Sequence, residues 1–150
     1  LTLPARRADG GRFVHQQQVR WADCDAAQIA YTGYIPGFAL NAIEAWWEAV
    51  IGADFFQLNF DHGLGTPFVR LEMDLLHPIT PRHTLDCDVR IARLGISSIA
   101  FYVEGTQADS TCFSGKFVCV VMEAATFEKI AIPNEIRDVA QRYMMPNGGL

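Results

Sequence analysis

Apolar and polar residues alternate along two stretches in the second half of the chain. Residues 69–75 read Val-Arg-Leu-Glu-Met-Asp-Leu, and residues 85–91 read Leu-Asp-Cys-Asp-Val-Arg-Ile. A period of two is typical of a strand that buries one face. The two prolines within residues 78–81 predict a turn between the two stretches. The pattern therefore predicts two half-buried strands joined by a turn.

Further strands are expected on both sides of this pair. A short strand pattern covers residues 13–22, and another covers residues 97–106. Residues 115–124 are apolar on both faces, as in a strand at the centre of a sheet. A shorter strand is expected around Ile130 and Ile132, and Pro133 should end it.

A different spacing marks residues 36–51, where apolar side chains surround most of a helix. These residues are Phe38, Leu40, Ile43, Trp46, Trp47, Val50 and Ile51. A helix that is apolar nearly all round is a buried one. Gly52 follows, and glycine commonly ends a helix. A second, short helix is expected over residues 136–143.

The predicted order is one strand, one long buried helix and then four or five consecutive antiparallel strands. A sheet with one apolar face must cover that face, and here only one long helix is available, so the sheet should curl around it. The predicted class is α+β, an antiparallel sheet wrapped around one central helix. Residues 12–150 are expected to form this single domain, and residues 1–11, which contain Pro4 and two glycines, a flexible arm.

Composition excludes several classes of function. Half of the 150 residues are hydrophobic, and the net charge of −5 argues against a nucleic-acid partner, which requires a basic face. The apolar stretches are too short to span a membrane, and no signal-peptide pattern is visible. Cys87 and Cys119 are expected to be buried free thiols, and no cysteine spacing indicates a metal site. A cytoplasmic protein without a membrane partner is expected.

Candidate chemistry lies in residues 21–31, where two carboxylates and a thiol precede the long helix. Asp23, Cys24 and Asp25 would lie near the N-terminus of that helix, whose free N–H groups and positive dipole stabilise developing negative charge. A nucleophile or base in this position suits acyl transfer. Acidic residues are also common before helices, so the same pattern would equally suit a capped turn.

The run Asp-Cys-Asp-Ala-Ala-Gln-Ile-Ala-Tyr at 23–31, the long helix, and the run Gly-Leu-Gly-Thr-Pro-Phe-Val at 63–69 together resemble hotdog-fold acyl-CoA thioesterases. The similarity is to the 4-hydroxybenzoyl-CoA thioesterase family, in the type whose catalytic acid is an aspartate before the central helix. It covers residues 13–145. The resemblance implies a hotdog fold and a thioester hydrolase that acts on an acyl-CoA. It also implies no cofactor, because CoA is part of the substrate.

The resemblance implies roles for individual residues. Asp25 would be the nucleophile or the general base, and the Thr32 backbone N–H would polarise the thioester carbonyl. Tyr31 would line the acyl pocket. In the family, a Gly-Thr-Pro segment approaches the site of a neighbouring subunit, and a turn with basic and small polar residues contacts CoA. The corresponding substrate-binding residues here are Gly65, Thr66, Arg93, Ser97 and Ser98.

Three features depart from the family pattern. The Asn-Tyr pair that is usual near the helix start is replaced by Tyr34-Ile35. Gln28 stands where the family usually has glycine, three residues after the catalytic aspartate. Asn41 or an apolar neighbour stands where a helix carboxylate is often found. The pattern therefore leaves both an aryl and a fatty acyl group open.

Two other functions are compatible with a hotdog fold. A dehydratase or hydratase would pair a histidine with an acid across an interface, and His15, His62, His77 and His83 are its candidates. A non-catalytic acyl-thioester binding module would need no acid, and the presence of Asp25 argues against it. Because hotdog subunits usually pair their sheets edge to edge, the resemblance implies a homodimer or homotetramer.

Overall fold

The computed structural model describes residues 11–146 of the chain. The arm expected at residues 1–11 lies outside the described residues except for Gly11. The longest helix, α1 (Ile35–Trp46), continues directly into a π-helical turn (Trp47–Ile51). Gly52 ends it with a φ of 101°, a left-handed conformation that glycine adopts without strain. The helix predicted at 36–51 is confirmed.

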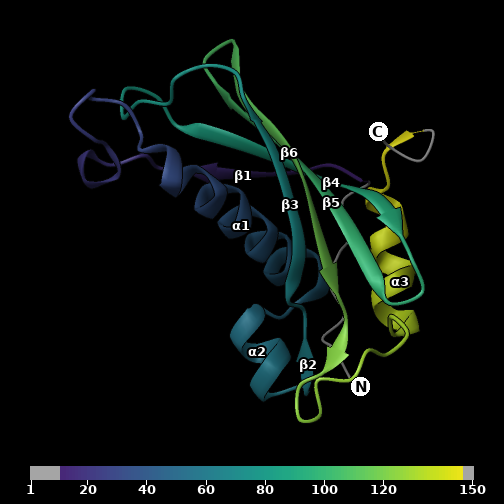
Figure 1. Cartoon of the computed structure of the whole chain (residues 1–150). Helices are drawn as coiled ribbons and strands as arrows, with labels where there is room; N and C mark the ends of the chain where they lie inside the picture. Colours follow the sequence, from purple (N-terminus) through teal and green to yellow (C-terminus); the bar gives the residue numbers. More distant parts are fainter. Residues whose placement is uncertain (1–10, 147–150) are drawn as a thin grey trace.

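One antiparallel sheet of five strands curls around α1 (Figure 1). In spatial order the strands are β1 (Phe13–Gln17), β4 (Leu85–Leu94), β5 (Ser98–Gln107), β6 (Ser110–Val120) and β3 (Phe68–Leu75). Helix α1 packs mainly against β1, β4 and β5. This is the hotdog arrangement of a sheet around one long helix, and the predicted fold class is confirmed.

The core lies between α1 and the inner face of the sheet. Trp46 and Trp47 are completely buried, and the Trp46 ring meets Phe101 of β5 and Tyr143 edge-on. Alternate residues of β4 are completely buried as well: Leu85, Cys87, Val89 and Ile91. The buried free thiols expected at Cys87 and Cys119 are confirmed.

Smaller elements complete the chain. Helix α2 (Phe55–Phe60) follows Gly52, and the Asp54 carboxylate caps it by accepting the Gln57 N–H at 2.8 Å. Strands β2 (Leu64–Gly65) and β7 (Met122–Glu123) form a separate two-stranded pair. Helix α3 (Asn134–Ala140) and a 3₁₀ turn (Gln141–Tyr143) form the helix expected near the end. None of the helices in the described part of the chain is long and apolar enough to cross a bilayer.

Two expected strands differ from the structure. The strand predicted at 13–22 ends at Gln17, and Trp21–Asp23 form a 3₁₀ turn. Ile132 is not in a strand; its N–H donates to the Ile96 carbonyl in the β4–β5 turn at 2.8 Å. Both segments find hydrogen-bond partners outside the sheet, which the local residue pattern does not encode.

Strand β3 forms where it was predicted, but its apolar side chains are not buried within the chain. Val69 is 62% exposed, and Leu71 and Leu75 are each 47% exposed. β3 is the last strand of the sheet and pairs only with β6 among the described residues. Its second edge is therefore unpaired, and α1 lies mainly against the other strands.

Candidate active site

Asp25 lies at the start of a tight hairpin turn before α1. Cys24 and Ala30 pair as an antiparallel bridge. The Asp25 N–H donates to the Ile29 carbonyl at 3.0 Å, and the Gln28 N–H donates to the Asp25 carbonyl at 2.9 Å. All four residues from Asp25 to Gln28 are exposed. The backbone therefore presents the turn, including Asp25, at the surface.

Gln28 adopts a left-handed conformation in this turn, with a φ of 65°. This conformation favours glycine, because a side chain there costs about 1–2 kcal/mol. Gln28 stands where the resembling family usually has glycine, so the turn keeps a shape that suits glycine despite the different residue.

The two carboxylates of this segment have different surroundings. The Asp23 Oδ2 accepts the Arg20 N–H at 2.8 Å, and the Asp23 carbonyl accepts the Tyr31 N–H at 2.8 Å. The Asp25 Oδ1 accepts the Ala27 N–H at 2.8 Å, whereas its Oδ2 has no hydrogen-bond partner among residues 11–146. Asp23 therefore stabilises the turn, and Asp25 offers an oriented carboxylate oxygen to the solvent.

Thr32 begins the helical segment that follows this hairpin. Residues Thr32–Tyr34 form a 3₁₀ turn that runs directly into α1 at Ile35. The first N–H groups of a helix have no intrahelical acceptor. The Thr32 N–H indeed has no acceptor in the described part of the chain, so it is available to a substrate oxygen.

A small apolar hollow adjoins this hairpin and has a volume of about 250 Å³. Ile29, Ala30, Thr32 and Ile35 line one side, and residues 75–79 line the other. The Ala30 N–H donates to the Ile79 carbonyl at 2.8 Å and joins the two sides. The 75–79 side was not predictable from local residues, because a contact between segments so far apart in the chain leaves no local pattern.

Tyr31, which was expected to line the acyl pocket, is not among the residues that line this hollow, whereas one histidine is. The Tyr31 ring is half exposed and meets the Tyr34 ring edge-on at 5.3 Å. Of the four histidines, His77 lines the hollow. His15 lies on β1, and His62 follows α2. His77 therefore lines the same hollow as Thr32. His62, which adjoins the glycine-rich run in the sequence, does not line it.

The other predicted substrate-binding residues lie away from Asp25. Residues 65–66 follow α2 in and after β2, and residues 93–98 lie at the β4–β5 turn. In Figure 1 these segments lie towards the C-terminal end of α1, whereas the Asp25 hairpin precedes its N-terminal end. The single chain thus brings Asp25, Tyr31 and Thr32 together and leaves apart Gly65, Thr66, Arg93, Ser97 and Ser98.

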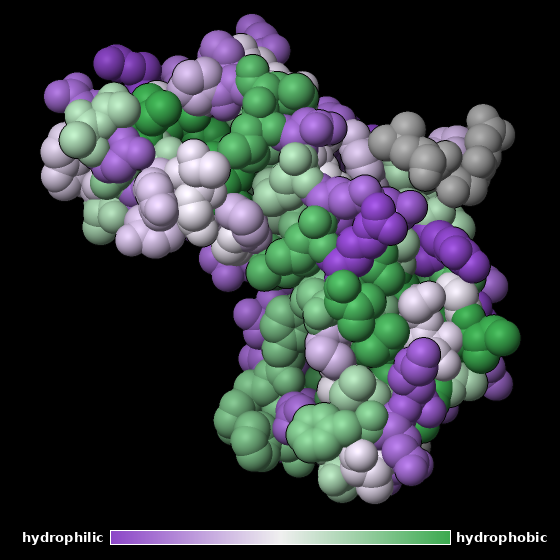
Figure 2. Space-filling view, viewed as in Figure 1, coloured by the Kyte–Doolittle hydropathy of each residue, from purple (hydrophilic) through white to green (hydrophobic). Residues whose placement is uncertain are grey.

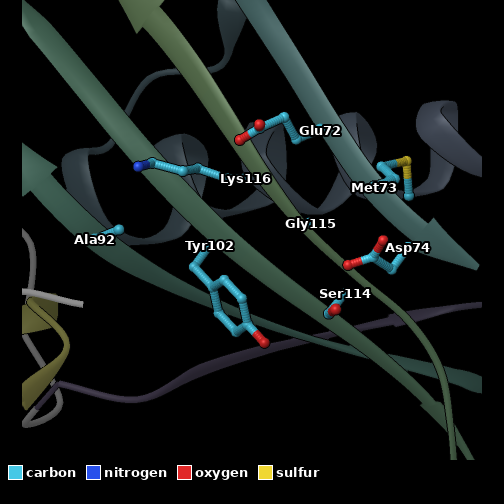
Figure 3. A pocket seen from close by; sticks show the side chains of 8 residues that line it. All are labelled: Glu72, Met73, Asp74, Ala92, Tyr102, Ser114, Gly115 and Lys116. Carbon is cyan, nitrogen blue, oxygen red and sulfur yellow. The ribbon is translucent and has the colours of Figure 1, made fainter. Parts of the chain in front are cut away.

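A second hollow of about 510 Å³ lies on the outer face of the sheet, with α1 behind it (Figure 3). Its polar lining includes Glu72 and Asp74 of β3, Tyr102 of β5, and Ser114 and Lys116 of β6. Burial and the nearby carboxylate of residue 104 raise the pKa of Tyr102. None of the predicted site residues lines this hollow, so the candidate active site is the one at Asp25.

Comparison with known proteins assigns the chain to a family. The family model described as "Thioesterase-like superfamily" matches residues 19–139. The chain belongs to the thioesterase-like superfamily. No curated protein matches it in sequence.

Solved structures support the same assignment for this thioesterase-like protein. A thioesterase superfamily structure from Jannaschia sp. CCS1 is 43% identical, with a TM-score of 0.86, and the match covers 96% of this chain and 99% of that one. A 1,4-dihydroxy-2-naphthoyl-CoA thioesterase from Synechocystis is 19% identical, with a TM-score of 0.78 and coverage of 87% and 96%. A DHNA-CoA thioesterase from Staphylococcus aureus is 14% identical, with a TM-score of 0.76 and coverage of 88% of both chains. The last two show the fold alone, and family membership supports thioester hydrolysis at the level of the family.

Proposed function

We propose that this thioesterase-like protein hydrolyses an acyl-CoA to the free acid and CoA, with Asp25 as nucleophile or general base. One observation carries the proposal. The unpartnered Asp25 Oδ2 and the unpartnered Thr32 N–H lie on one short segment, the first in the hairpin turn and the second where the helical segment begins. The first can attack or activate water, and the second can stabilise the oxygen that becomes charged.

The reaction uses these two groups together. In one route Asp25 attacks the thioester carbonyl carbon and expels the CoA thiolate, and water then hydrolyses the resulting mixed anhydride to the free acid and restores the Asp25 carboxylate. In the other route Asp25 takes a proton from the water that attacks the carbonyl carbon, and the CoA thiolate leaves as the free acid forms. Both routes place negative charge on the carbonyl oxygen. An oriented N–H donor at that oxygen lowers the barrier by about 3–4 kcal/mol. The helix dipole adds to this effect at the N-terminal end of the segment. No cofactor takes part, because CoA enters with the substrate.

The hollow beside Thr32 suits the acyl part of the substrate. Its lining is apolar except for Thr32 and His77. Pockets of this kind bind apolar groups and use a few polar groups for orientation. We therefore assign the acyl group to the aryl or aliphatic class, without a charged substituent.

A second copy of the chain would complete the site. The unpaired edge of β3 carries exposed apolar residues: Val69, Leu71, Leu75 and, just beyond the strand, Leu76. Figure 2 shows apolar surface along this strand, with hydrophilic side chains beside it. An exposed apolar edge strand is a template for pairing with another chain. We therefore propose a homodimer, or a homotetramer built from such dimers, with paired β3 edges.

Antiparallel pairing would also bring the separated residues together. β3 starts just after Gly65 and Thr66, and it ends at the hollow lined by Thr32. When two copies of one strand pair antiparallel, the start of one lies beside the end of the other. Gly65 and Thr66 of one copy would then approach the Asp25 hairpin of the other. Arg93, Ser97 and Ser98 lie at the same end of the folded molecule as Gly65 and Thr66, and they would contact CoA.

Two matched substitutions test the proposed acid. Asp25→Asn and Asp23→Asn both keep the size of the side chain and a hydrogen-bond acceptor. CoA thiol release with a colour reagent is measured on a panel of aryl- and fatty-acyl-CoAs. The parent should release CoA from at least one of them, and Asp25→Asn should lower kcat by about 10³ or more. Asp23→Asn should retain most activity, because its oxygen can still accept the Arg20 N–H. Equal activity of Asp25→Asn and the parent would refute the assignment.

A further inference from the structure

Gln107 is an unusual residue in this core. It ends β5 and is only 5% exposed. No other amide or charged side chain in the described part of the chain is buried to this degree. A buried amide is unfavourable unless all of its polar groups are paired.

All three side-chain hydrogen bonds of Gln107 are made with one loop. The Thr80 N–H donates to Gln107 Oε1 at 3.0 Å, and Gln107 Nε2 donates to the Thr80 carbonyl at 2.7 Å. The second Nε2 hydrogen goes to the His83 carbonyl at 2.8 Å. The side chain thus pairs with the backbone of Thr80 as a neighbouring strand would. This loop, residues 76–84 between β3 and β4, belongs to no strand of its own.

The same loop holds the Asp25 hairpin. Ile79, next to Thr80, is 1% exposed, and its carbonyl accepts the Ala30 N–H at 2.8 Å. Ala30 closes the hairpin through its bridge to Cys24. The four residues of the turn itself are exposed, so no buried side chain of the turn holds it in place. Its position relative to the sheet therefore depends on Ala30 and on the loop that Ala30 contacts.

We infer that Gln107 is a positioning residue for the Asp25 hairpin. Its three hydrogen bonds hold the loop at Thr80 and His83, the loop carbonyl at Ile79 holds Ala30, and Ala30 closes the turn through its bridge to Cys24. The role in catalysis rests on the proposed thioesterase function. A displacement of about 1 Å in a catalytic group can lower a rate by about 10².

The test compares two substitutions in the same strand. Gln107→Met keeps the approximate size of the side chain but removes all three hydrogen bonds. Val103→Ala is the control, because Val103 is fully buried in β5 but lies four residues, roughly 13 Å, before Gln107. Both variants are assayed at a temperature at which urea unfolding shows each to be folded. Gln107→Leu, which likewise removes all three hydrogen bonds without burying a charge, replaces Gln107→Met if that variant does not fold.

Two readouts are expected to separate positioning from general destabilisation. In Gln107→Met, kcat for acyl-CoA hydrolysis should fall at least about tenfold while KM changes by less than about threefold. The Ala30 amide should exchange with solvent deuterium at least about tenfold faster by NMR. Val103→Ala should leave both quantities within about twofold of the parent. An unchanged kcat in the folded Gln107 variant overturns the catalytic role, and an unchanged Ala30 exchange rate overturns the positioning itself. If the parent hydrolyses no acyl-CoA, the proposed function fails, and the Ala30 exchange rate alone still decides whether Gln107 positions the hairpin.

Discussion

Strand β4 buries alternate apolar side chains completely from Leu85 to Ile91, whereas β3 leaves Val69, Leu71 and Leu75 exposed. In β4, Val89 and Ile91 are 0% exposed, because β1 and β5 flank the strand and α1 covers it. In β3, Leu71 and Leu75 are each 47% exposed, although they stand opposite Phe117 and Phe113 on the same side of the sheet. The two strands have the same alternation of residues and differ in what covers them.

Alternation of apolar and polar residues therefore reflects a strand's surroundings in the assembled protein, and not necessarily in one chain. The side chains of β4 find their cover within the chain, so each buried methylene contributes to its folding. Those of β3 lie at an unpaired edge, where we propose a second copy.

The largest expected effect is a difference in alkylation rate between the buried thiols of the sheet and a partly exposed thiol outside it. Burial, together with the nearby Asp86, raises the pKa of Cys87 in β4 to about 12, and burial raises that of Cys119 in β6 to about 12. At pH 8 very little thiolate is present at these two sites, whereas Cys24 is only half-buried. Iodoacetamide should therefore modify Cys24 about 10³-fold faster than either thiol, as followed by mass spectrometry of peptides. Cys24→Ser is the control that should remove the fast reaction. Rapid modification of Cys87 in the folded protein would contradict the burial described for β4.

A charge on the edge of β3 should have the next largest effect. Leu71→Asp places like charges close to each other if two β3 edges pair, and it should yield a monomer with kcat/KM at least about 10²-fold lower. Sedimentation and acyl-CoA hydrolysis measure the two outcomes. Glu72→Gln is the control. Glu72 is the next residue to Leu71 and lies on the opposite face of β3, so this variant should keep both the mass and the activity of the parent. A Leu71→Asp protein with unchanged mass and activity would exclude pairing through this edge.

Truncation of apolar side chains should distinguish the two strands by stability. Val89→Ala should lower the free energy of unfolding by about 2 kcal/mol, because it leaves a cavity in the core. Leu75→Ala should cost less than about 1 kcal/mol in dilute protein, where its exposed side chain loses few contacts. Urea unfolding at two protein concentrations measures both. If second copies cover β3, the loss of unfolding free energy in Leu75→Ala should increase with protein concentration. The loss in Val89→Ala should not depend on concentration. Equal costs in dilute protein would mean that β3 is covered within the chain.

The smallest effect belongs to the Asp25 turn, which depends on local backbone conformation more than on cover. Gln28→Gly should raise the free energy of unfolding by about 0.5 kcal/mol, because glycine removes the strain of a φ of 65° but adds freedom to the unfolded chain. Ala26→Gly in the same turn should lower it by about 0.4–1 kcal/mol, because Ala26 does not have a positive φ. Urea unfolding measures both changes. A loss of stability in Gln28→Gly would show that the Gln28 side chain makes a contact that outweighs the strain.

Several elements were predictable from the sequence because their signals are local. The spacing of apolar residues in α1 and the glycine at position 52 predicted both the helix and its end. The alternation in β4 predicted a strand with one buried face. Helix α2 was missed although Asp54 caps it, because six residues are too few to show a helical period. Residues 130–132 contain two isoleucines but form no strand, since Ile132 finds its partner in the β4–β5 turn.

Some features of the candidate site were likewise predictable from local residues, and others were not. That Asp25 precedes a helix start follows from neighbouring residues. Thr32 was indicated by resemblance alone, and the structure shows that it begins the helical segment with its N–H free of an acceptor among the described residues. The choice between Asp23 and Asp25 was suggested by resemblance. The structure adds a physical distinction, since Asp23 accepts the Arg20 N–H and Asp25 keeps one oxygen without a partner.

Local residue patterns set the helix, most strands and the place of the acidic residues before the helix, because their hydrogen bonds and periodicity involve residues close together in the chain. The segment that lies across from the Asp25 hairpin is defined only by the folded structure. The contact from Ala30 to Ile79, and from Thr80 to Gln107, joins segments that meet only after the sheet has closed around α1. The exposure of β3 was likewise decided by its place at the end of the sheet, since strand order is a property of the whole fold.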